Sequence, residues 1–402
     1  MDAAKAGVER DDVALLTGSD AGEVLAAALA VEGAHLTDWR VHSVHHRPGA
    51  GVSVGYTVKL GEDDANHYLC ATTSRVSAAP GPGLVRLDNG ERVIHVWRHP
   101  GDPTLPALAD ACTPAGLARR LELQGAPSID LISYRPLRRA VVRARSSELP
   151  DGEVYVKVVQ PSTAAEFTAR HDMLTGAGIP APRCLHSSDD GLVVLSSGRG
   201  VSLATRLAEG LDDDESGAVI DNIVAMLDAI PPAAMELPRR PAWSERASHY
   251  AHAASVVLPQ HAARIERVAR AVTHGLTTTD PGPVVPTHGD LYEANLLMAG
   301  TDIATMLDVD SLGPGHRVDD LACLLAHMSV LSCLAASSYP HVPAMLPLWT
   351  KLCDAHVDPA ALRIRCAGVV LSLIAGARSQ TRQDWLADAE CRLAQAEAWL
   401  EA

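Results

Sequence analysis

The chain has 402 residues, of which 47% are apolar, and a formal net charge of −15 at neutral pH. This length allows two or three domains with a substantial core, and the apolar fraction excludes a disordered protein. The acidic excess argues against a surface for nucleic acid or an anionic membrane, and we expect neither partner. It is compatible with attraction of a cationic substrate, although an acidic surface also simply keeps a protein in solution.

The aromatic residues and cysteines indicate what kind of core and which compartment to expect. Phe167 is the single phenylalanine, so the core must be mostly aliphatic. Eight cysteines are scattered without a Cys-x-x-Cys pair, mostly in apolar contexts, and we expect buried free thiols in a reducing compartment. The sequence has no basic start followed by an apolar stretch, and no uninterrupted apolar run of about 18 residues. We therefore expect a cytoplasmic protein.

The first 125 residues have the pattern of a small α/β segment. A helix is predicted over residues 20–31, with Asp20 as its N-cap and Glu23 completing a capping box. Strands are predicted by alternation over residues 52–58 and 67–71. Residues 106–123 then have a helical pattern.

A weak internal repeat follows, because residues 46–52 resemble residues 134–141 and a hairpin is predicted after each. Only the second copy carries a lysine, Lys157, within its apolar strand. A lysine there is costly unless it is paired or reaches solvent. Glu166, on the next predicted helix, is a candidate partner, and a structural ion pair explains the two residues as well as a nucleotide site does.

The pattern changes after the buried strand predicted at residues 191–195. Residues 196–200 have the composition of a flexible joint, and long helical segments follow. Trp243 lies in a loop, where packing is the favoured interpretation over contact with a ligand. Asp319 and Asp320 fall in the first turn of a long apolar helix, where a carboxylate can satisfy free backbone amides. We divide the chain into residues 1–125, 126–198 and 199–402.

The most informative stretch runs from Thr287 to Met298 and carries Asp290 and Asn295 between apolar segments. Thirteen residues after Asn295, Asp308 follows an apolar strand. A base, a side-chain amide and a metal-binding carboxylate in this order are what a kinase catalytic loop and metal-binding strand need. Two unrelated turns with solvated acids are the alternative interpretation, and the ordered set makes it the weaker one.

Together these residues resemble the aminoglycoside phosphotransferase and choline kinase-like superfamily of protein-kinase-like folds. The resemblance implies an α+β, bilobal fold with an antiparallel sheet in the N-lobe and a mostly helical C-lobe. Residues 1–125 look like the additional N-terminal α/β cap of maltokinase-like sugar kinases. The matching pieces are Lys157, Glu166, the loop from His288 to Asn295, Leu307 with Asp308, and the helix start Asp320, Leu321 and Ala322.

The sequence departs from the family pattern at two informative places. Residues 135–140 occupy the position of a glycine-rich phosphate loop but contain no glycine, a departure that is frequent in this superfamily. Val309 follows the metal aspartate where protein kinases have phenylalanine. That second difference fits a small-molecule kinase rather than a protein kinase.

The resemblance also implies a role for each site residue. Asp290 would accept the proton of the attacking hydroxyl or orient it, and His288 would shape the loop. Lys157, positioned by Glu166, would contact the phosphates of ATP. The implied magnesium ligands are Asn295, Asp308 and, as a further ligand or a neighbour of one, Asp310, and the implied adenine-binding backbone is that of Leu195, Ser196, Ser197 and Gly198.

We therefore predict an ATP-dependent phosphotransferase that transfers the γ-phosphate to a hydroxyl of a small molecule. A sugar, an amino sugar or an aminoglycoside is the expected acceptor, with ATP and Mg²⁺ as cofactors. The alternative is a catalytically silent, kinase-like protein that binds nucleotide or regulates a partner. The identity of the acceptor, the choice between ATP and GTP, the role of the cap and the oligomeric state stay open at this stage.

Overall fold

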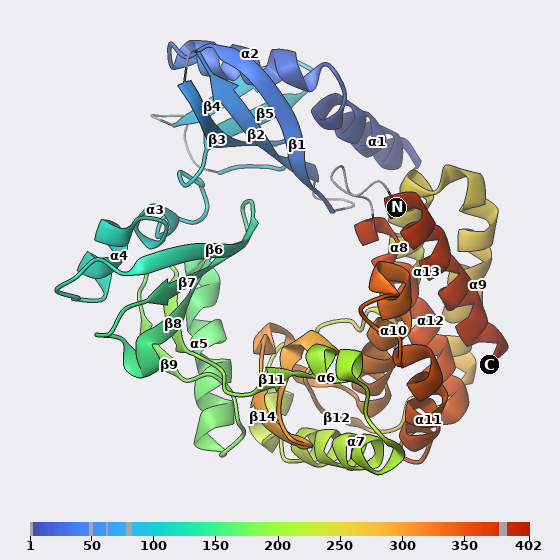
Figure 1. The fold of residues 1–402 in the computed structure, drawn as a ribbon. Helices are drawn as coiled ribbons and strands as arrows, with labels where there is room; N and C mark the ends of the chain where they lie inside the picture. Colours follow the sequence, from blue (N-terminus) through green and yellow to red (C-terminus); the bar gives the residue numbers. More distant parts are fainter. Residues whose placement is uncertain (1–2, 48–50, 62, 78–82, 378–383) are drawn as a thin grey trace. The chain divides into compact units, whose positions relative to one another are not determined.

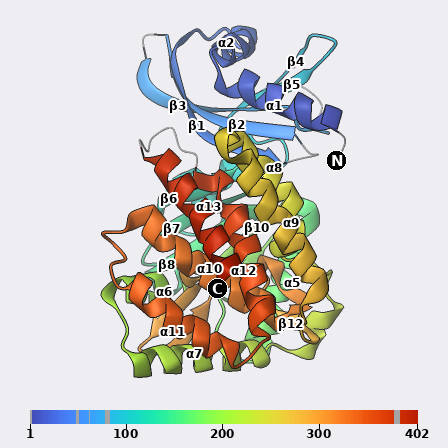
Figure 2. The same ribbon diagram turned by 90° about the vertical axis from the view of Figure 1, so that its right-hand side faces the viewer.

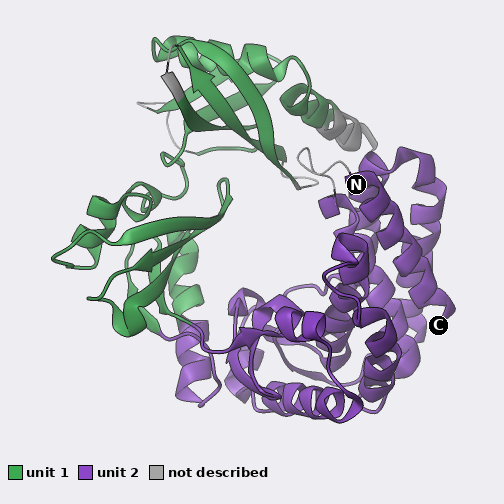
Figure 3. Cartoon of the chain, viewed as in Figure 1, with its two compact units in different colours: residues 1–168, 184–197 green, residues 169–183, 198–402 purple. Residues whose placement is uncertain are grey.

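The computed structural model describes residues 3–47, 51–61, 63–77, 83–377 and 384–402. Two compact units divide the chain, residues 1–168 with 184–197 (unit 1) and residues 169–183 with 198–402 (unit 2) (Figure 3). Unit 1 is built mainly from antiparallel strands and unit 2 mainly from helices (Figure 1). The architecture is the predicted α+β class. The three-domain division stays a prediction, although the chain changes unit between Ser197 and Gly198, next to the predicted border.

The first sheet of unit 1 has five antiparallel strands in the order β1-β2-β3-β5-β4. Two helices pack on it, and Leu16, Leu25 and Leu29 bury their side chains against Val54 and Tyr56 of β2. The Tyr56 hydroxyl also donates to the Leu16 carbonyl at 2.6 Å. The elements are α1 (Ala3–Thr17), α2 (Ala21–Val31), β1 (Leu36–Arg47), β2 (Gly51–Leu60), β3 (Asp63–Thr72), β4 (Leu84–Asp88) and β5 (Val93–Arg98).

The second sheet repeats this topology with the strand order β6-β7-β8-β10-β9. The described ends of the first similar segment, residues 46–47 and 51–52, pair at the end of β1 and the start of β2, and residues 134–141 join β6 to β7 in the same way, while residues 48–50 lie outside the described residues. The shared strand order of the two sheets confirms the predicted repeat. Lys157 lies in the third strand of the second sheet. The elements are α3 (Leu108–Ala111), α4 (Pro114–Arg120), β6 (Ser128–Arg135), β7 (Arg139–Arg145), β8 (Glu153–Val159), α5 (Pro161–Gly176), β9 (Cys184–Ser187) and β10 (Leu192–Ser196).

Unit 2 is a helical body in which α12 packs against α9, α10 and α13 (Figure 2). Its core is a single cluster of mostly aliphatic side chains, as the shortage of aromatic residues requires. The helices are α6 (Leu203–Glu209), α7 (Asp213–Asp228), α8 (Ala247–Val257), α9 (Ala262–Thr278), α10 (Arg317–Ala335), α11 (Val342–Asp354), α12 (Pro359–Leu373) and α13 (Trp385–Glu401).

Two small sheets hold the loops of unit 2. One pairs β12 (Val284–Thr287) with β15 (Gly313–His316), and the other contains β11 (Val201–Ser202), β13 (Leu296–Ala299) and β14 (Asp302–Met306). The stretch that carries Asp290 and Asn295 connects these two sheets. Its ends are therefore fixed on both sides by strand pairing.

Within the described part of the chain, two helices are long and apolar enough to cross a membrane by length and composition, Arg317–Ala335 and Pro359–Ala377. The bent pair Asp11–Thr17 and Ala21–Val31 could make a third such span. Within the two long helices, 67% and 61% of the apolar window is buried inside the protein. Their apolar side chains thus form part of the core of unit 2.

The start of α2 differs from the prediction. Asp20 has a helical backbone, with φ −67° and ψ −18°, and its side chain makes no capping bond. An N-cap needs a non-helical backbone to turn its side chain onto the first amides, so the predicted capping box is wrong. A complete capping box instead begins α7, where Asp212 and Glu215 bond each other's backbone amides. The helical pattern of residues 106–123 resolves into the two short helices α3 and α4.

The cysteines require a second correction. Cys333 and Cys391 form a disulfide between α10 and α13, so the prediction of free thiols is wrong for this pair. The two residues are 58 positions apart, and only the packing of the two helices brings them together. The other six cysteines are free, and four of them are buried.

Candidate active site

The second residue of the loop after β12 is a glycine that no other residue can replace without strain. Gly289 has φ +78°, and a side chain there would place its Cβ 2.6 Å from the carbonyl oxygen of Ser311. Thr287 fixes the end of β12 before the loop, because its hydroxyl donates to the Gly313 carbonyl of β15 at 2.9 Å. The loop therefore starts as a tight turn packed against the chain that leads into β15.

Asp320, in the first turn of α10, anchors the loop. Its carboxylate accepts hydrogen bonds from the amides of His288 at 3.0 Å and of Gly289 at 2.8 Å. The residue is 1% exposed, and burial raises the pKa of this carboxyl. The sequence predicted that Asp319 or Asp320 satisfies amides at the start of its own helix. For Asp320 this is wrong, because its carboxylate accepts from the amides of the loop that carries Asp290.

His288 shapes the same loop through both ring nitrogens. Nε2 lies 2.8 Å from the Leu307 carbonyl, and the Asp290 amide donates to Nδ1 at 3.2 Å. A carbonyl can only accept, so Nε2 carries the hydrogen and Nδ1 is the acceptor. Both ring nitrogens are thus engaged with the backbone, which agrees with the predicted shaping role rather than with a catalytic base.

Asn295 and Asp308 are brought together by the β13–β14 hairpin. The Leu307 amide donates to the Asn295 carbonyl at 2.7 Å, so Asn295 lies beside the residue that precedes Asp308. The side-chain nitrogen of Asn295 donates to the Asp290 carbonyl at 2.9 Å. That bond uses the amide nitrogen and leaves the Oδ1 atom, a hard oxygen donor, for another partner.

Asp308 has a left-handed backbone with φ 52° and ψ 53°. Aspartate tolerates this region better than most residues, but it still stores strain, and such conformations cluster at functional sites. No group of three or more His, Cys, Asp or Glu residues within the described ranges is arranged to hold a metal ion by itself. The oxygens of Asn295 and Asp308 nevertheless fit Mg²⁺, which binds through one or two carboxylates together with substrate phosphates.

Trp243 is the site residue whose role the sequence did not reveal. Its Nε1 donates to Oδ1 of Asp290 at 3.1 Å, and its side chain remains 36% exposed. The indole also lies against Tyr250 of α8, with ring centroids 5.8 Å apart. The expected packing role is therefore incomplete, because the same ring contacts the candidate base.

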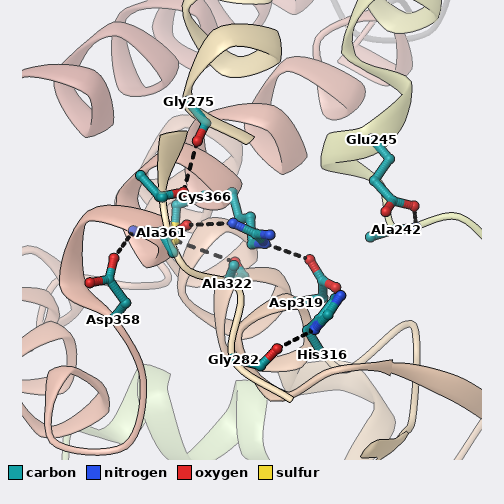
Figure 4. Close-up of polar contacts among 12 residues, drawn as sticks. Ala242, Glu245, Gly275, Gly282, His316, Asp319, Ala322, Asp358, Ala361 and Cys366 are labelled. Carbon is teal, nitrogen blue, oxygen red and sulfur yellow. Dashed lines mark hydrogen bonds and ion pairs between the residues drawn. The ribbon is translucent and has the colours of Figure 1, made fainter. Parts of the chain in front are cut away.

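A pocket opens beside this contact, within unit 2. Asp319 and Arg365 both line it and form an ion pair, with Nε and Oδ1 2.9 Å apart, and both side chains are largely buried. Figure 4 shows the position of Asp319. Burial raises the pKa of Asp319, against the lowering effect of Arg365. The pocket is lined by Arg239, Arg240, Ala242, Trp243, Ser244, Thr287, Gly289, Ser311, Pro314, Gly315, Asp319, Arg365 and Val369.

The predicted phosphate-binding residues lie in unit 1. Lys157 is only 7% exposed, and its ammonium lies 4.5 Å from the centroid of the Phe167 ring. Glu166 precedes Phe167 on α5. Burial with an aromatic face beneath the charge explains how a lysine is tolerated in so apolar a strand.

The predicted adenine-binding segment follows the end of β10. Leu195 and Ser196 close this strand, and the Ser197 hydroxyl donates to Glu153 at 3.3 Å. Gly198 belongs to unit 2, where a Cβ atom would lie 2.7 Å from the Leu297 side chain. A side chain does not fit at this position.

The β6–β7 turn occupies the position of a glycine-rich loop. The Leu137 amide donates to Asp102 at 2.8 Å, and the Leu137 carbonyl accepts from Gln160 at 2.7 Å. Leu137 has φ 64° and is buried. The backbone of Leu137 is thus engaged with protein groups, unlike the free amides of a phosphate loop.

A family model described as the phosphotransferase enzyme family matches residues 141–351, slightly more than half of the chain. The chain belongs to the phosphotransferase enzyme family. The matched range includes Lys157, Glu166, Asp290, Asn295 and Asp308, and the predicted superfamily is confirmed. The first sheet of unit 1 and its two helices lie outside the match, and their likeness to a maltokinase-like cap stays a prediction.

Three solved structures illustrate what this phosphotransferase is similar to. A thermostable mutant of aminoglycoside phosphotransferase APH(4)-Ia is 14% identical, with 71% of this chain and 97% of that chain covered and a TM-score of 0.47. APH(3'')-Id from Streptomyces rimosus, solved with ADP and streptomycin, is 19% identical, with 64% of this chain and 97% of that chain covered and a TM-score of 0.43. The macrolide 2'-phosphotransferase MphH from Brachybacterium faecium is 18% identical, with 69% of this chain and 96% of that chain covered and a TM-score of 0.41. None of the curated proteins matches this chain.

Proposed function

We propose that this phosphotransferase transfers the γ-phosphoryl group of Mg²⁺-bound ATP to a hydroxyl of a sugar-like small molecule. The observation that carries the proposal is the contact between Trp243 and Asp290, 3.1 Å long, at the edge of a pocket. A candidate base lies in a loop anchored by buried bonds, and it adjoins a concave surface that could hold an acceptor.

In the proposed reaction, the oxygen of the acceptor hydroxyl attacks the γ-phosphorus of ATP. A new O–P bond forms while the bond between the γ-phosphorus and its bridging oxygen breaks, and ADP leaves with the electron pair. Asp290 accepts the hydroxyl proton and later releases it to water. Hydrogen bonds with Asp320, His288 and Asn295 hold the backbone around Asp290, and Trp243 donates to the carboxylate itself before the substrates bind.

Asn295 and Asp308 would hold the magnesium ion, with Asp310 as a neighbour in the turn that follows. The ion, when bound, neutralises charge on the β- and γ-phosphates. Lys157 is proposed to contact the α- and β-phosphates, and Glu166 to position it. The segment from Leu195 to Gly198 is proposed to bind adenine through its backbone.

The lining of the pocket favours a polyhydroxylated acceptor. Trp243 offers a partly exposed aromatic face, on which the apolar face of a sugar ring can lie. Hydroxyls and guanidinium groups around it can bond ring hydroxyls. Sugars, amino sugars and aminoglycosides share these features.

A screen of ATP consumption over these three acceptor classes tests the proposal, with wild type and Asp290→Asn compared side by side. We expect turnover with at least one acceptor in wild type and a loss of about 1,000-fold or more in the variant, because the proton acceptor is gone. Nucleotide binding, followed by thermal shift with ATP and Mg²⁺, should persist in both proteins. A thermal shift without turnover on any acceptor would favour the silent, regulatory alternative.

A further inference from the structure

The pocket beside Asp290 differs in charge from the chain as a whole. The chain carries a net charge of −15, yet the pocket is lined by three arginines, Arg239, Arg240 and Arg365. Among the described residues that line it, Asp319 is the one carboxylate. Because charges act over short distances in salt solution, this lining and not the net charge decides which ligand is attracted.

Two of the three arginines are already neutralised. Arg365 pairs with Asp319 at 2.9 Å and is 4% exposed. Arg239 pairs with Glu245 at 2.5 Å, and this hydrogen bond raises the pKa of the guanidinium. Glu245 is further engaged by the Ala242 amide at 2.9 Å (Figure 4). Neither carboxylate is left to bind an ammonium group of an acceptor.

Arg240 is the third arginine, and its situation is different. Its side chain is exposed, and its one hydrogen bond within the described ranges is a long one of 3.4 Å to the Ser311 hydroxyl. No carboxylate of the described chain neutralises it. Its five N–H groups form a planar fork that suits the two oxygens of a carboxylate or a phosphate.

We infer that the pocket takes an acceptor with a hydroxyl for phosphorylation and an oxyanion, a carboxylate or phosphate, that Arg240 binds. This inference rests on the proposed function and narrows its substrate class. The acceptor is anchored by the oxyanion at Arg240 and by its ring against Trp243, and its hydroxyl then lies toward Asp290. A polycationic aminoglycoside finds the wrong charge in this pocket.

Four hexoses with one carbon skeleton test this charge preference: glucose, glucosamine, glucuronate and glucose 6-phosphate. ADP release is measured with wild type, Arg240→Gln and the control Arg270→Gln. Arg270 is an exposed arginine of α9 outside the pocket, so its variant makes the same chemical change elsewhere. We expect kcat/KM in wild type to be higher for glucuronate or glucose 6-phosphate than for glucosamine.

In Arg240→Gln, KM for the preferred oxyanion acceptor should rise about 10- to 100-fold, the value of one charge-assisted bidentate contact. The selectivity over glucose should fall with it, and Arg270→Gln should retain the selectivity of wild type. The carboxylate and phosphate arms show which oxyanion the site prefers. Preference for glucosamine, or equal selectivity in wild type and Arg240→Gln, overturns the inference while leaving the proposed phosphotransfer intact.

A binding measurement decides the case in which none of the hexoses is phosphorylated. Glucuronate and inorganic phosphate are titrated calorimetrically into wild type and Arg240→Gln saturated with a non-hydrolysable ATP analogue and Mg²⁺. Saturable binding that weakens at least tenfold in Arg240→Gln supports the oxyanion site even without turnover. Equal binding in the two proteins, or none in either, overturns it. Failure of the proposed function is read separately, from the absence of turnover in the acceptor screen.

Discussion

Oδ1 of Asp320 accepts a hydrogen bond from the Gly289 amide at 2.8 Å, across 31 residues of sequence. The other oxygen of the same carboxylate accepts from the His288 amide at 3.0 Å. One buried side chain thus fixes the turn immediately before Asp290. The position of the candidate base therefore depends on a helix that follows it in the chain and contributes no atom to the proposed reaction.

Asp320→Asn should test this dependence. Asparagine has the same shape, but its NH₂ group would face a backbone N–H, which leaves a buried donor without an acceptor. We expect a loss of about 2 to 4 kcal/mol in the free energy of unfolding and a fall in kcat of about 10- to 100-fold as the loop loosens. Urea unfolding and steady-state kinetics measure the two effects.

Asp213→Asn is the matched control, because Asp213 is an exposed aspartate in the first turn of α7. Its removal should change stability by no more than about 0.5 kcal/mol. If the two variants behave alike, the anchoring role of Asp320 is wrong.

Lys157→Met should separate nucleotide binding from folding. Methionine retains an apolar stem over the Phe167 ring, so the fold should survive, but the charge proposed to contact the phosphates is lost. We expect the Kd for ATP with Mg²⁺ to rise about 10- to 100-fold. Lys351→Met, at an exposed lysine of α11, should bind ATP as wild type does. An unchanged ATP saturation curve in Lys157→Met would remove Lys157 from the nucleotide site.

The residues that local spacing could identify are those within one loop or strand. Asp290, Asn295 and Asp308 stood out because a base, an amide and a carboxylate recur there in a fixed order between apolar segments. The structure joins them through the Asn295 side chain and the β13–β14 pairing. The repeat of two sheets was also visible, because the strand pattern and the connecting segments are both local features.

Roles that depend on distant packing could not be read in this way. Trp243 lies 47 residues before Asp290, and nothing in its loop indicates which side chain it meets. Asp320 has the sequence context of a helix N-terminus, where most acids bond their own helix, so the more frequent arrangement was predicted. The charge of the pocket was missed for the same reason, since Arg239, Arg240 and Arg365 gather only in the folded chain.

His327 should make stability depend on pH. It stacks on Tyr292 with centroids 4.4 Å apart, and burial lowers its pKa from 6.5 to about 4. The unfolded chain therefore binds a proton at this residue before the folded chain does as the pH falls. Its contribution to stability is fully present above pH 6.5 and is lost as the pH falls toward 4, by up to roughly 3 kcal/mol.

The buried Glu293 acts in the opposite direction, because burial raises its pKa to about 7, so it favours the fold as the pH falls from 7 to 4.5. The comparison must therefore be made between variants and not within wild type alone. The free energy of unfolding of His327→Gln should fall less steeply than that of wild type between pH 6.5 and 4.5. Parallel curves for the two proteins would show that His327 does not titrate as described.

The Cys333–Cys391 disulfide can be tested by counting free thiols. Unfolded protein without reductant should expose six reactive thiols to a thiol reagent, and reduced protein eight. A cross-link over 58 residues restricts the unfolded chain, so the double variant Cys333→Ser with Cys391→Ser should lose about 2 to 4 kcal/mol in the free energy of unfolding. The control is Cys112→Ser, at a partly buried free cysteine. It should show one thiol fewer than wild type both without reductant and after reduction, so that reduction still adds two thiols. Eight thiols without reductant would instead mean that α10 and α13 pack without the bond.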